Sequence, residues 1–244
     1  MFKHALMKAS ADRPQLSPSF RAASLPGSAG SSPERVPEPN APRSVSGADL
    51  RWRTVDIAVA AALGVACGLV FWGFNYVYVV IAPILRDLLP GFASILHALW
   101  YFSGPLALLI IRKPGAAVFV NVVGSLTEMV LGNPYPVSSV ILSALLQGLA
   151  SEIPFAVTRY RRFSPAMSVA SGALTAFEYG VYLIVTMYQG RSMAYMTIHM
   201  ISEMVGGILI AGVMGWWLYV AIARTGALYR FASGREVSGD VDQS

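Results

Sequence analysis

Long apolar runs separated by short polar breaks fill the chain between about residues 51 and 230. A helix needs about 20 predominantly apolar residues to cross the hydrocarbon core of a bilayer, and these runs have about that length. The pattern predicts an all-α membrane protein, folded as a bundle of six transmembrane helices. The predicted helices are Thr54–Phe74, which can continue with a break through "YVYVVIAPIL", Phe92–Ile111, Ala116–Leu131, Val137–Val157, Pro165–Met187 and Tyr195–Ala223.

The polar breaks carry residues that end helices. They read "RKPG", "GNPYP", "YRRFSP" and "YQGRS". Proline and glycine at such places stop a helix and favour a tight turn. Loops this short join antiparallel neighbours, so we expect one compact bundle.

The positions of lysine and arginine predict the orientation of the bundle, because cytoplasmic loops carry an excess of these residues. If six helices alternate, Arg86 and Arg191 fall on one side and the other basic residues of this region fall on the opposite side. Both termini are therefore expected in the cytoplasm. The residues on the cytoplasmic side are Arg51, Arg53, Arg112, Lys113, Arg159, Arg161, Arg162, Arg224 and Arg230.

Residues 1–50 differ from the rest in being rich in Ser, Pro, Ala and Arg. A segment with so little apolar content cannot offset its ordering entropy, so we expect a disordered cytoplasmic tail. It also lacks the continuous apolar run of a secretory signal peptide. We therefore divide the chain into this tail, a six-helix transmembrane domain at 51–230 and a short polar C-terminal tail at 231–244.

Composition agrees with a protein of the plasma membrane and excludes other classes. The 244 residues are 55% hydrophobic and 13% charged, whereas soluble domains are about 25% charged. The net charge of +5 comes from basic residues at the ends of apolar segments, which argues against nucleic acid as a partner. The single cysteine, Cys67, excludes an intrachain disulfide, and we expect no metal and no cofactor.

Three glutamates lie inside apolar runs: Glu128 in "GSLTEMVLGNPY", Glu203 in "IHMISEMVGG", and Glu178. A charged side chain at the centre of a membrane helix costs about 2.5–3.5 kcal/mol on insertion scales, so such a residue faces the bundle interior or a watery cavity. Helical spacing places other polar side chains on the same faces, and nearly all of them fall in the outer half. We therefore predict one polar, aromatic-lined pocket that opens to the outside.

The residues predicted to bind a substrate in this pocket are Trp72, Asn75, Trp100, Asn121, Glu128, Gln147, Glu178, Tyr182, His199 and Glu203. His97 is equally well explained as a lining residue or as an interfacial one. Glu152 fits a structural pairing with Arg159 or Arg161 at least as well as contact with a ligand. Several acids and aromatic rings with few bases suit a flat ligand that carries a positive charge or several hydrogen-bond donors.

A stripe of small residues marks the first helix. Ala58, Ala62 and Ala66 follow one another at intervals of four, so they share one face. Small residues at this spacing let another helix approach closely. Two interpretations stay open: the stripe packs inside the bundle, or it docks a separate membrane subunit.

The six-helix plan, the alanine stripe and the run "GSLTEMVLGNPYP" together resemble the substrate-binding S components of energy-coupling factor (ECF) transporters, and more narrowly the YkoE-type family associated with thiamine and hydroxymethylpyrimidine. The resemblance covers about Arg51 to Arg230. It implies capture of a vitamin from outside, a transmembrane T subunit that touches Ala58, Ala62 and Ala66, and two partner ABC ATPases that drive toppling of the S component in the membrane. The sequence contains no Walker A loop, so we expect a transport subunit rather than an enzyme.

Two other functions remain as alternatives. Buried Glu and His residues can relay protons, which would suit a proton-coupled secondary transporter, although six helices without an evident inverted repeat are few for that class. An intramembrane enzyme is less well supported, because the sequence contains no recognisable catalytic motif such as HExxH.

Overall fold

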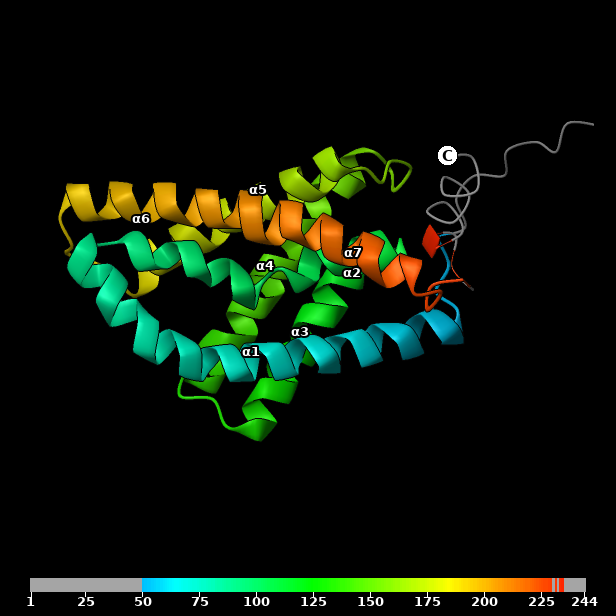
Figure 1. The fold of residues 1–244 in the computed structure, drawn as a ribbon, viewed down its shortest axis with the longest axis horizontal. Coiled ribbons are helices and arrows are strands. Elements are labelled where there is room, and N and C mark those ends of the chain that lie inside the picture. The colour runs from blue at the N-terminus through cyan, green and yellow to red at the C-terminus, as the bar shows by residue number, and fades with distance from the viewer. Residues whose placement is uncertain (1–49, 230, 232, 235–244) are drawn as a thin grey trace, which may run out of the picture. The chain divides into compact units, whose positions relative to one another are not determined.

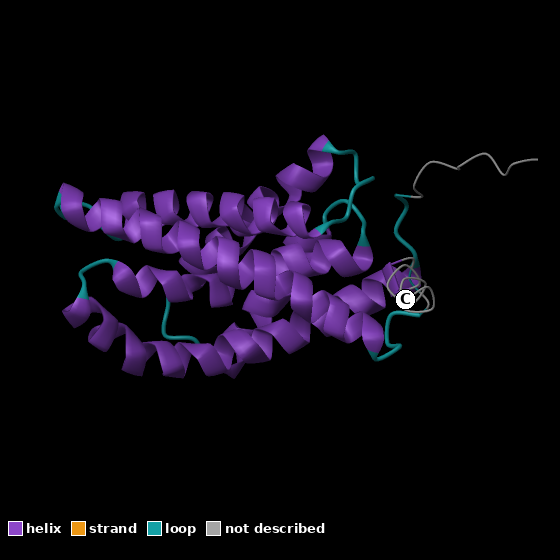
Figure 2. Ribbon diagram, turned by 45° about the horizontal axis from the view of Figure 1, so that its top comes forward, coloured by secondary structure: helices purple, strands orange, loops and turns teal. Residues whose placement is uncertain are grey.

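The structure, a computed structural model, describes residues 50–229, 231, 233 and 234. The tail predicted at 1–50 therefore lies outside the described residues, except for Leu50. Arg230 and the tail predicted at 231–244 also lie outside them, except for positions 231, 233 and 234. Every regular element in the described part is helical, with no strand among them (Figure 2). The predicted all-α class is confirmed for this part of the chain.

Nine helical elements follow one another along the described residues (Figure 1). They are α1 (Thr54–Leu88), the 3-10 helix η1 (Phe92–Trp100), α2 (Ser103–Ile111), α3 (Ala116–Leu131), α4 (Val137–Val157), α5 (Pro165–Thr186), α6 (Met193–Gly206), the π-helix η2 (Gly207–Met214) and α7 (Gly215–Arg224).

Helix α1 is longer than the sequence predicts. Its first turn is closed by Asp56, which is fully buried and accepts a hydrogen bond from the backbone N–H of Arg53 at 2.9 Å. The helix then runs to Leu88 without the predicted break, with Pro83 inside it. Neighbouring helices and local adjustments re-satisfy the backbone groups that a proline frees in a membrane helix, so the helix continues. Its second half bends toward η1 (Figure 1).

The predicted helix Phe92–Ile111 is an α-helix only in its second half. Gly91 begins the first half with φ 94°, and a Cβ atom there would lie 2.9 Å from the backbone nitrogen of His199. The 3-10 geometry of η1 follows, with three residues per turn, so residues spaced by three lie directly above one another. Ser94, His97 and Trp100 therefore share one side of η1.

Three consecutive elements form the last long helical segment. The predicted helix Tyr195–Ala223 is observed as continuous helix from Met193 to Arg224, with the π-helix η2 in its middle. Helix α5 packs against η2 so closely that a Cβ atom on Gly172 would lie 2.3 Å from the carbonyl oxygen of Gly207. Only glycine permits this approach.

Helix α2 forms the centre of the bundle. All nine of its residues are buried, and it contacts α1, α3, α4, α5 and α7. The other helices lie around it, with α1 beside α3, α4 beside α3 and α5, and α6 beside η1. A helix that is apolar and buried on every side is typical of a core position.

Five helical segments of the described chain are long and apolar enough to cross a membrane: 54–88, 92–111, 137–157, 165–186 and 193–224. Helix α3 is also apolar, but its 16 residues span only about 24 Å at 1.5 Å per residue. The hydrocarbon core is about 30 Å thick. The predicted count of six transmembrane helices therefore stays a prediction, with α3 as the short member.

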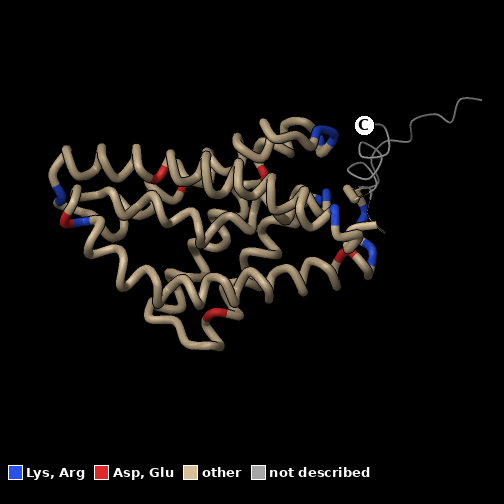
Figure 3. Tube along the Cα trace, viewed as in Figure 1, with Lys and Arg blue, Asp and Glu red and all other residues tan. Residues whose placement is uncertain are grey.

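Basic residues gather at two ends of the bundle. Figure 3 shows several of them at the end where α1 begins and α7 ends, and a smaller group at the opposite end. The smaller group contains Arg86, in the last turn of α1, and Arg191, just before α6. The distribution is the one from which the sequence predicts cytoplasmic termini, and that orientation remains a prediction.

Close packing of α1 against α3 generates the first testable prediction. A Cβ atom on Gly68 would lie 2.5 Å from the carbonyl oxygen of Gly124, whereas a Cβ atom on Gly73 would meet nothing within 4 Å. We expect Gly68→Ala to lower the free energy of unfolding by about 1–3 kcal/mol through overpacking. Gly73→Ala, its control on the same helix, should leave stability unchanged or raise it by about 0.5–1 kcal/mol. Thermal unfolding in detergent measures both, and equal stabilities would contradict the packing of α1 on α3.

Candidate functional site

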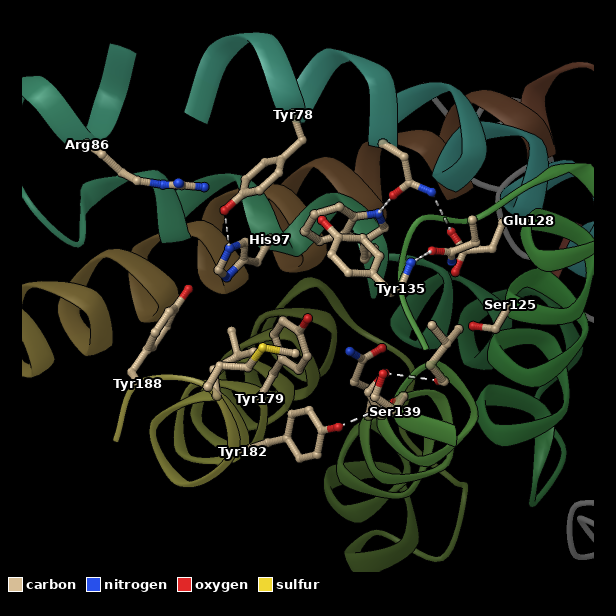
Figure 4. A pocket seen from close by; sticks show the side chains of 18 residues that line it. Tyr78, Arg86, His97, Ser125, Glu128, Tyr135, Ser139, Tyr179, Tyr182 and Tyr188 are labelled. Carbon is tan, nitrogen blue, oxygen red and sulfur yellow. Dashed lines mark hydrogen bonds between the residues drawn. The ribbon is translucent and has the colours of Figure 1, made fainter. Parts of the chain in front are cut away.

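A cavity of about 190 Å³ lies between α1, η1, α3, α4 and α5, with the loop between α3 and α4 at its side. We call it the cup. Figure 4 shows its side chains converging from these elements. The cup is lined by Asn75, Tyr78, Arg86, His97, Trp100, Ser125, Glu128, Asn133, Tyr135, Ser139, Val140, Ser143, Gln147, Tyr179, Tyr182, Leu183, Met187 and Tyr188.

One wall of the cup holds a carboxylate in a short hydrogen-bonded chain. The indole N–H of Trp100 donates to Asn75 Oδ1 at 2.9 Å, and Asn75 Nδ2 donates to Glu128 Oε2 at 3.2 Å. Asn75 and Glu128 are both buried. These two hydrogen bonds connect η1, α1 and α3, so they fix the position of the Glu128 carboxylate before any ligand arrives.

Several aromatic rings line the cup and pack against one another. Tyr78 and Trp100 meet at 4.8 Å between ring centroids, Trp100 and Tyr135 at 6.1 Å, and Tyr179 and Tyr182 stack at 5.9 Å. Such rings offer faces to a flat heteroaromatic ligand or to a cation.

A second hydrogen-bonded network supports the cup from behind. Tyr78 Oη lies 2.8 Å from His97 Nε2, and His97 Nδ1 lies 2.7 Å from Glu203 Oε2. Tyr101 donates its hydroxyl to Glu203 Oε1 at 2.9 Å. Glu203 is fully buried and does not line the cup. Through the contact with Nδ1 it holds the ring of His97, which does line the cup.

His199 lies beside this network and away from the cup. Its Nδ1 is hydrogen-bonded to Ser94 Oγ, and its Nε2 lies 3.2 Å from the carbonyl oxygen of Gly180. The ring thus joins α6 to η1 and α5. His199 and Glu203 lie four residues apart on α6. Both belong to a buried layer between η1 and α6, and neither lines the cup.

The structure brings half of the predicted site residues to the cup. Asn75, Trp100, Glu128, Gln147 and Tyr182 line it, and Trp72, Asn121, Glu178, His199 and Glu203 do not.

Three of the residues outside the cup have other surroundings. Asn121 accepts a hydrogen bond from Ser103. Trp72 packs on Tyr76 at 5.4 Å between ring centroids. The Oε2 atom of Glu178 is buried without a hydrogen-bond partner among the described residues.

Sequence reasoning missed several lining residues. Tyr78 lies one turn beyond Asn75 on α1, in the part that the prediction separated by a break. Tyr179 follows Glu178, and the cup faces Tyr179 and Tyr182 rather than Glu178. The spacing of Asn75 with Tyr78, and of Tyr179 with Tyr182, is i, i+3, which also places side chains on one face.

Two tyrosines of the loops around the cup stay protonated at neutral pH. Burial raises the pKa of Tyr135 above its usual value, and it raises the pKa of Tyr188 as well. Both phenols therefore remain hydrogen-bond donors throughout the physiological range.

Glu152 has a structural position, but its partners are Ala117 and Tyr160 instead of the predicted Arg159 or Arg161. Its Oε1 accepts the backbone N–H of Ala117 at 2.9 Å, and its Oε2 accepts the hydroxyl of Tyr160 at 2.6 Å. The carboxylate thereby satisfies a backbone donor in the first turn of α3. Burial and this hydrogen bond raise the pKa of Tyr160.

The alanine stripe lies on the outside of the bundle. Ala58, Ala62 and Ala66 are all exposed, whereas Gly64 and Gly68 on the same helix pack against α3. Within the described residues, no group of three or more His, Cys, Asp or Glu side chains is placed to hold a metal ion.

A helical bundle with membrane-length segments around a polar, aromatic cup defines an integral membrane protein that binds a small substrate. Comparison with known proteins gives the family. Residues 55–178 match the family described as "ABC-type cobalt transport system, permease component", and the chain belongs to this family.

Two relatives place the chain among transporter subunits. It is 28% identical over 187 residues to the "Putative HMP/thiamine permease protein YkoE" of Bacillus subtilis (strain 168), which covers 76% of this chain and 92% of that protein. It also matches the "Crystal structure of an S-component of ECF transporter" with a TM-score of 0.72 and 25% identity, over 79% of this chain and 96% of that one. The predicted resemblance to ECF S components is confirmed, and with it a substrate-binding subunit of the plasma membrane.

Helix α4 offers a test of the cup itself. Ser143 lines it, whereas Ser151, two turns further along the same face, is fully buried and hydrogen-bonded to Thr175 at 2.7 Å. In a Cys67→Ala background, we expect Ser143→Cys to react with a charged, membrane-impermeant thiol reagent at least about tenfold faster than Ser151→Cys, because thiol reactivity needs solvent access. Mass spectrometry follows the labelling. Equal rates would show that the cup is closed to water or that α4 is turned differently.

Proposed function

We propose that this chain is the substrate-binding subunit of an ATP-driven importer and that its cup captures hydroxymethylpyrimidine or thiamine from outside the cell. The observation that carries the proposal is the Glu128 carboxylate, held by Asn75 in the wall of an aromatic cup. The name of the Bacillus subtilis relative supports a pyrimidine ligand. In this proposal both termini are cytoplasmic and the cup opens outward.

The chemistry of the cup suits an aminopyrimidine. The amino group and a protonated ring nitrogen form an edge with two donors, and a carboxylate accepts such an edge as a pair of charge-assisted hydrogen bonds. Gln147 and the hydroxyl groups of Ser139 and Ser143 supply further polar contacts. The rings of Trp100 and Tyr179 cover the ligand's faces.

The size of the cup fits one ring more readily than two. A dry cavity of about 150 Å³ is enough to bind benzene, and the cup has about 190 Å³. A substituted pyrimidine therefore fills it. The second ring of thiamine would extend toward Arg86 and Tyr188.

The same proposal includes a transmembrane T subunit and two ABC ATPases as partners. The exposed stripe of Ala58, Ala62 and Ala66 supports a docking face, because small residues let a helix of another subunit approach the backbone closely. The stripe and the cup-lining residues Asn75 and Tyr78 belong to the same helix, α1. In this proposal, docking and substrate capture thus involve the same helix.

The first test of this function is binding in detergent. We expect Glu128→Gln to weaken binding of hydroxymethylpyrimidine or thiamine at least tenfold, a loss of about 1.4 kcal/mol, because the neutral amide cannot accept two donors. Quenching of tryptophan fluorescence, to which the cup residue Trp100 contributes, measures the Kd. The matched control is Glu178→Gln, a glutamate of α5 outside the cup, which should bind within about twofold of the unchanged protein. Loss of affinity in the control alone would contradict the site.

The second test separates docking from capture. Ala62→Trp should leave ligand binding intact and abolish uptake in cells that contain the T subunit and ATPases, because the bulky ring prevents close helix approach. Ala170→Trp, an exposed alanine on α5, serves as the control and should keep uptake. Uptake that persists without the partner subunits would instead support proton-coupled secondary transport.

A further inference from the structure

A second cavity, of about 260 Å³, adjoins the cup at the end of the bundle that holds Arg86 and Arg191. It is lined by Arg86, Pro90, Tyr188, Arg191 and Tyr195. Arg86 and Tyr188 line both cavities. The second cavity thus neighbours the cup, with these two side chains as their common wall, and we call it the mouth site.

The two arginines of the mouth site are held by aromatic rings and not by acids. The Arg86 guanidinium lies 6.0 Å from the centroid of the Tyr78 ring, and that of Arg191 lies 5.3 Å from the Tyr195 ring. Figure 4 shows Arg86 extending toward Tyr78, with Tyr188 on the opposite side of the opening. Among the described residues, neither arginine forms a salt bridge with a carboxylate. Their positive charge is therefore not neutralised by the protein.

We propose that the mouth site binds the phosphate group of a phosphorylated ligand whose ring occupies the cup, so that the protein accepts phosphate monoesters as well as the corresponding alcohols. This inference rests on the proposed function, because the ring must be held by Glu128 and the aromatic wall. A guanidinium presents a planar fork of N–H donors that matches phosphate oxygens and often binds them in pairs. The hydroxyls of Tyr188 and Tyr195 add neutral donors at the same opening.

The charge distribution along the two cavities supports this division. The cup contains the acid Glu128, which suits the donor edge of the ring, and the mouth contains two cations, which suit an anion. A phosphate placed at the mouth would be attracted by Arg86 and Arg191. The two ends of a phosphorylated pyrimidine therefore find opposite charges.

A lipid headgroup is the other source of phosphate at this end of the bundle. The structure favours a phosphorylated ligand over a lipid headgroup, because Arg86 lines the cup itself. Arg86 also contacts Tyr78, whose hydroxyl is hydrogen-bonded to the cup residue His97. The experiment below distinguishes the two sources.

The test compares each alcohol with its phosphate monoester: hydroxymethylpyrimidine with its phosphate, and thiamine with thiamine monophosphate. Isothermal titration in detergent gives the Kd of each. We expect at least one ester to bind as tightly as its alcohol or more tightly. We expect Arg191→Gln to weaken ester binding about tenfold, as for a lost hydrogen bond to a charged group, and to change alcohol binding less than about twofold.

Two further variants that change charge serve as controls. Arg161→Gln removes a positive charge at the other end of the bundle and should change neither Kd. Asp87→Asn removes the acid next to Arg86 and should leave ester binding unchanged or strengthen it. Added salt should weaken ester binding more than alcohol binding, because exposed charges are screened.

The outcomes are separable. If alcohols bind and the esters bind at least tenfold more weakly, or if Arg191→Gln lowers both affinities equally, the mouth site does not hold the ligand's phosphate and the proposed function stands. If neither alcohols nor esters bind, the proposed function itself fails. If anionic lipid added to the detergent abolishes the ester's advantage over the alcohol, the arginines bind lipid headgroups and the inference is overturned.

Discussion

The buried contact between His97 and Glu203 is the constraint on which the rest of the site depends. Glu203 is inaccessible to solvent and lies within hydrogen-bonding distance of His97 and Tyr101, so removing either partner would leave a polar group in an apolar interior, which costs about 1–3 kcal/mol or more if it is charged. This contact holds η1 against α6. It therefore also sets the position of Trp100, which lies one 3-10 turn after His97, and through Trp100 it fixes Asn75 and Glu128.

The bundle combines this rigid back wall with a more adaptable front. The loop between α3 and α4 brings Asn133 and Tyr135 to the cup, and the residues after α5 bring Tyr188. Loops carry fewer internal hydrogen bonds than helices, so they are the parts of a scaffold most able to move around a ligand. The Glu128 carboxylate is thus held by helices, while the loops add Asn133, Tyr135 and Tyr188 to the wall of the cup.

The sequence predicted the helical class, the approximate helix bounds and the acid of the cup, because apolar run length and buried charge are local signals. Glu128, Asn75 and Trp100 could be named because the predicted helices place all three in the outer half of the membrane. It could not predict that Glu203 supports His97 instead of facing a ligand, because that depends on how η1 packs across α6. Nor does hydropathy show that residues 92–100 form a 3-10 helix, or that α1 continues past Phe74 and brings Tyr78 to the site.

The length of α1 has a further consequence for entry of a ligand. Its 35 residues extend about 52 Å at 1.5 Å per residue, well beyond a hydrocarbon core of about 30 Å. Even with a bend and a tilt, part of such a helix must stand in the headgroup layer or in water. Arg86, in its last turn, is suited to that polar zone. A solute could then reach the opening directly from the aqueous phase, and partitioning into lipid would not be a step in its path.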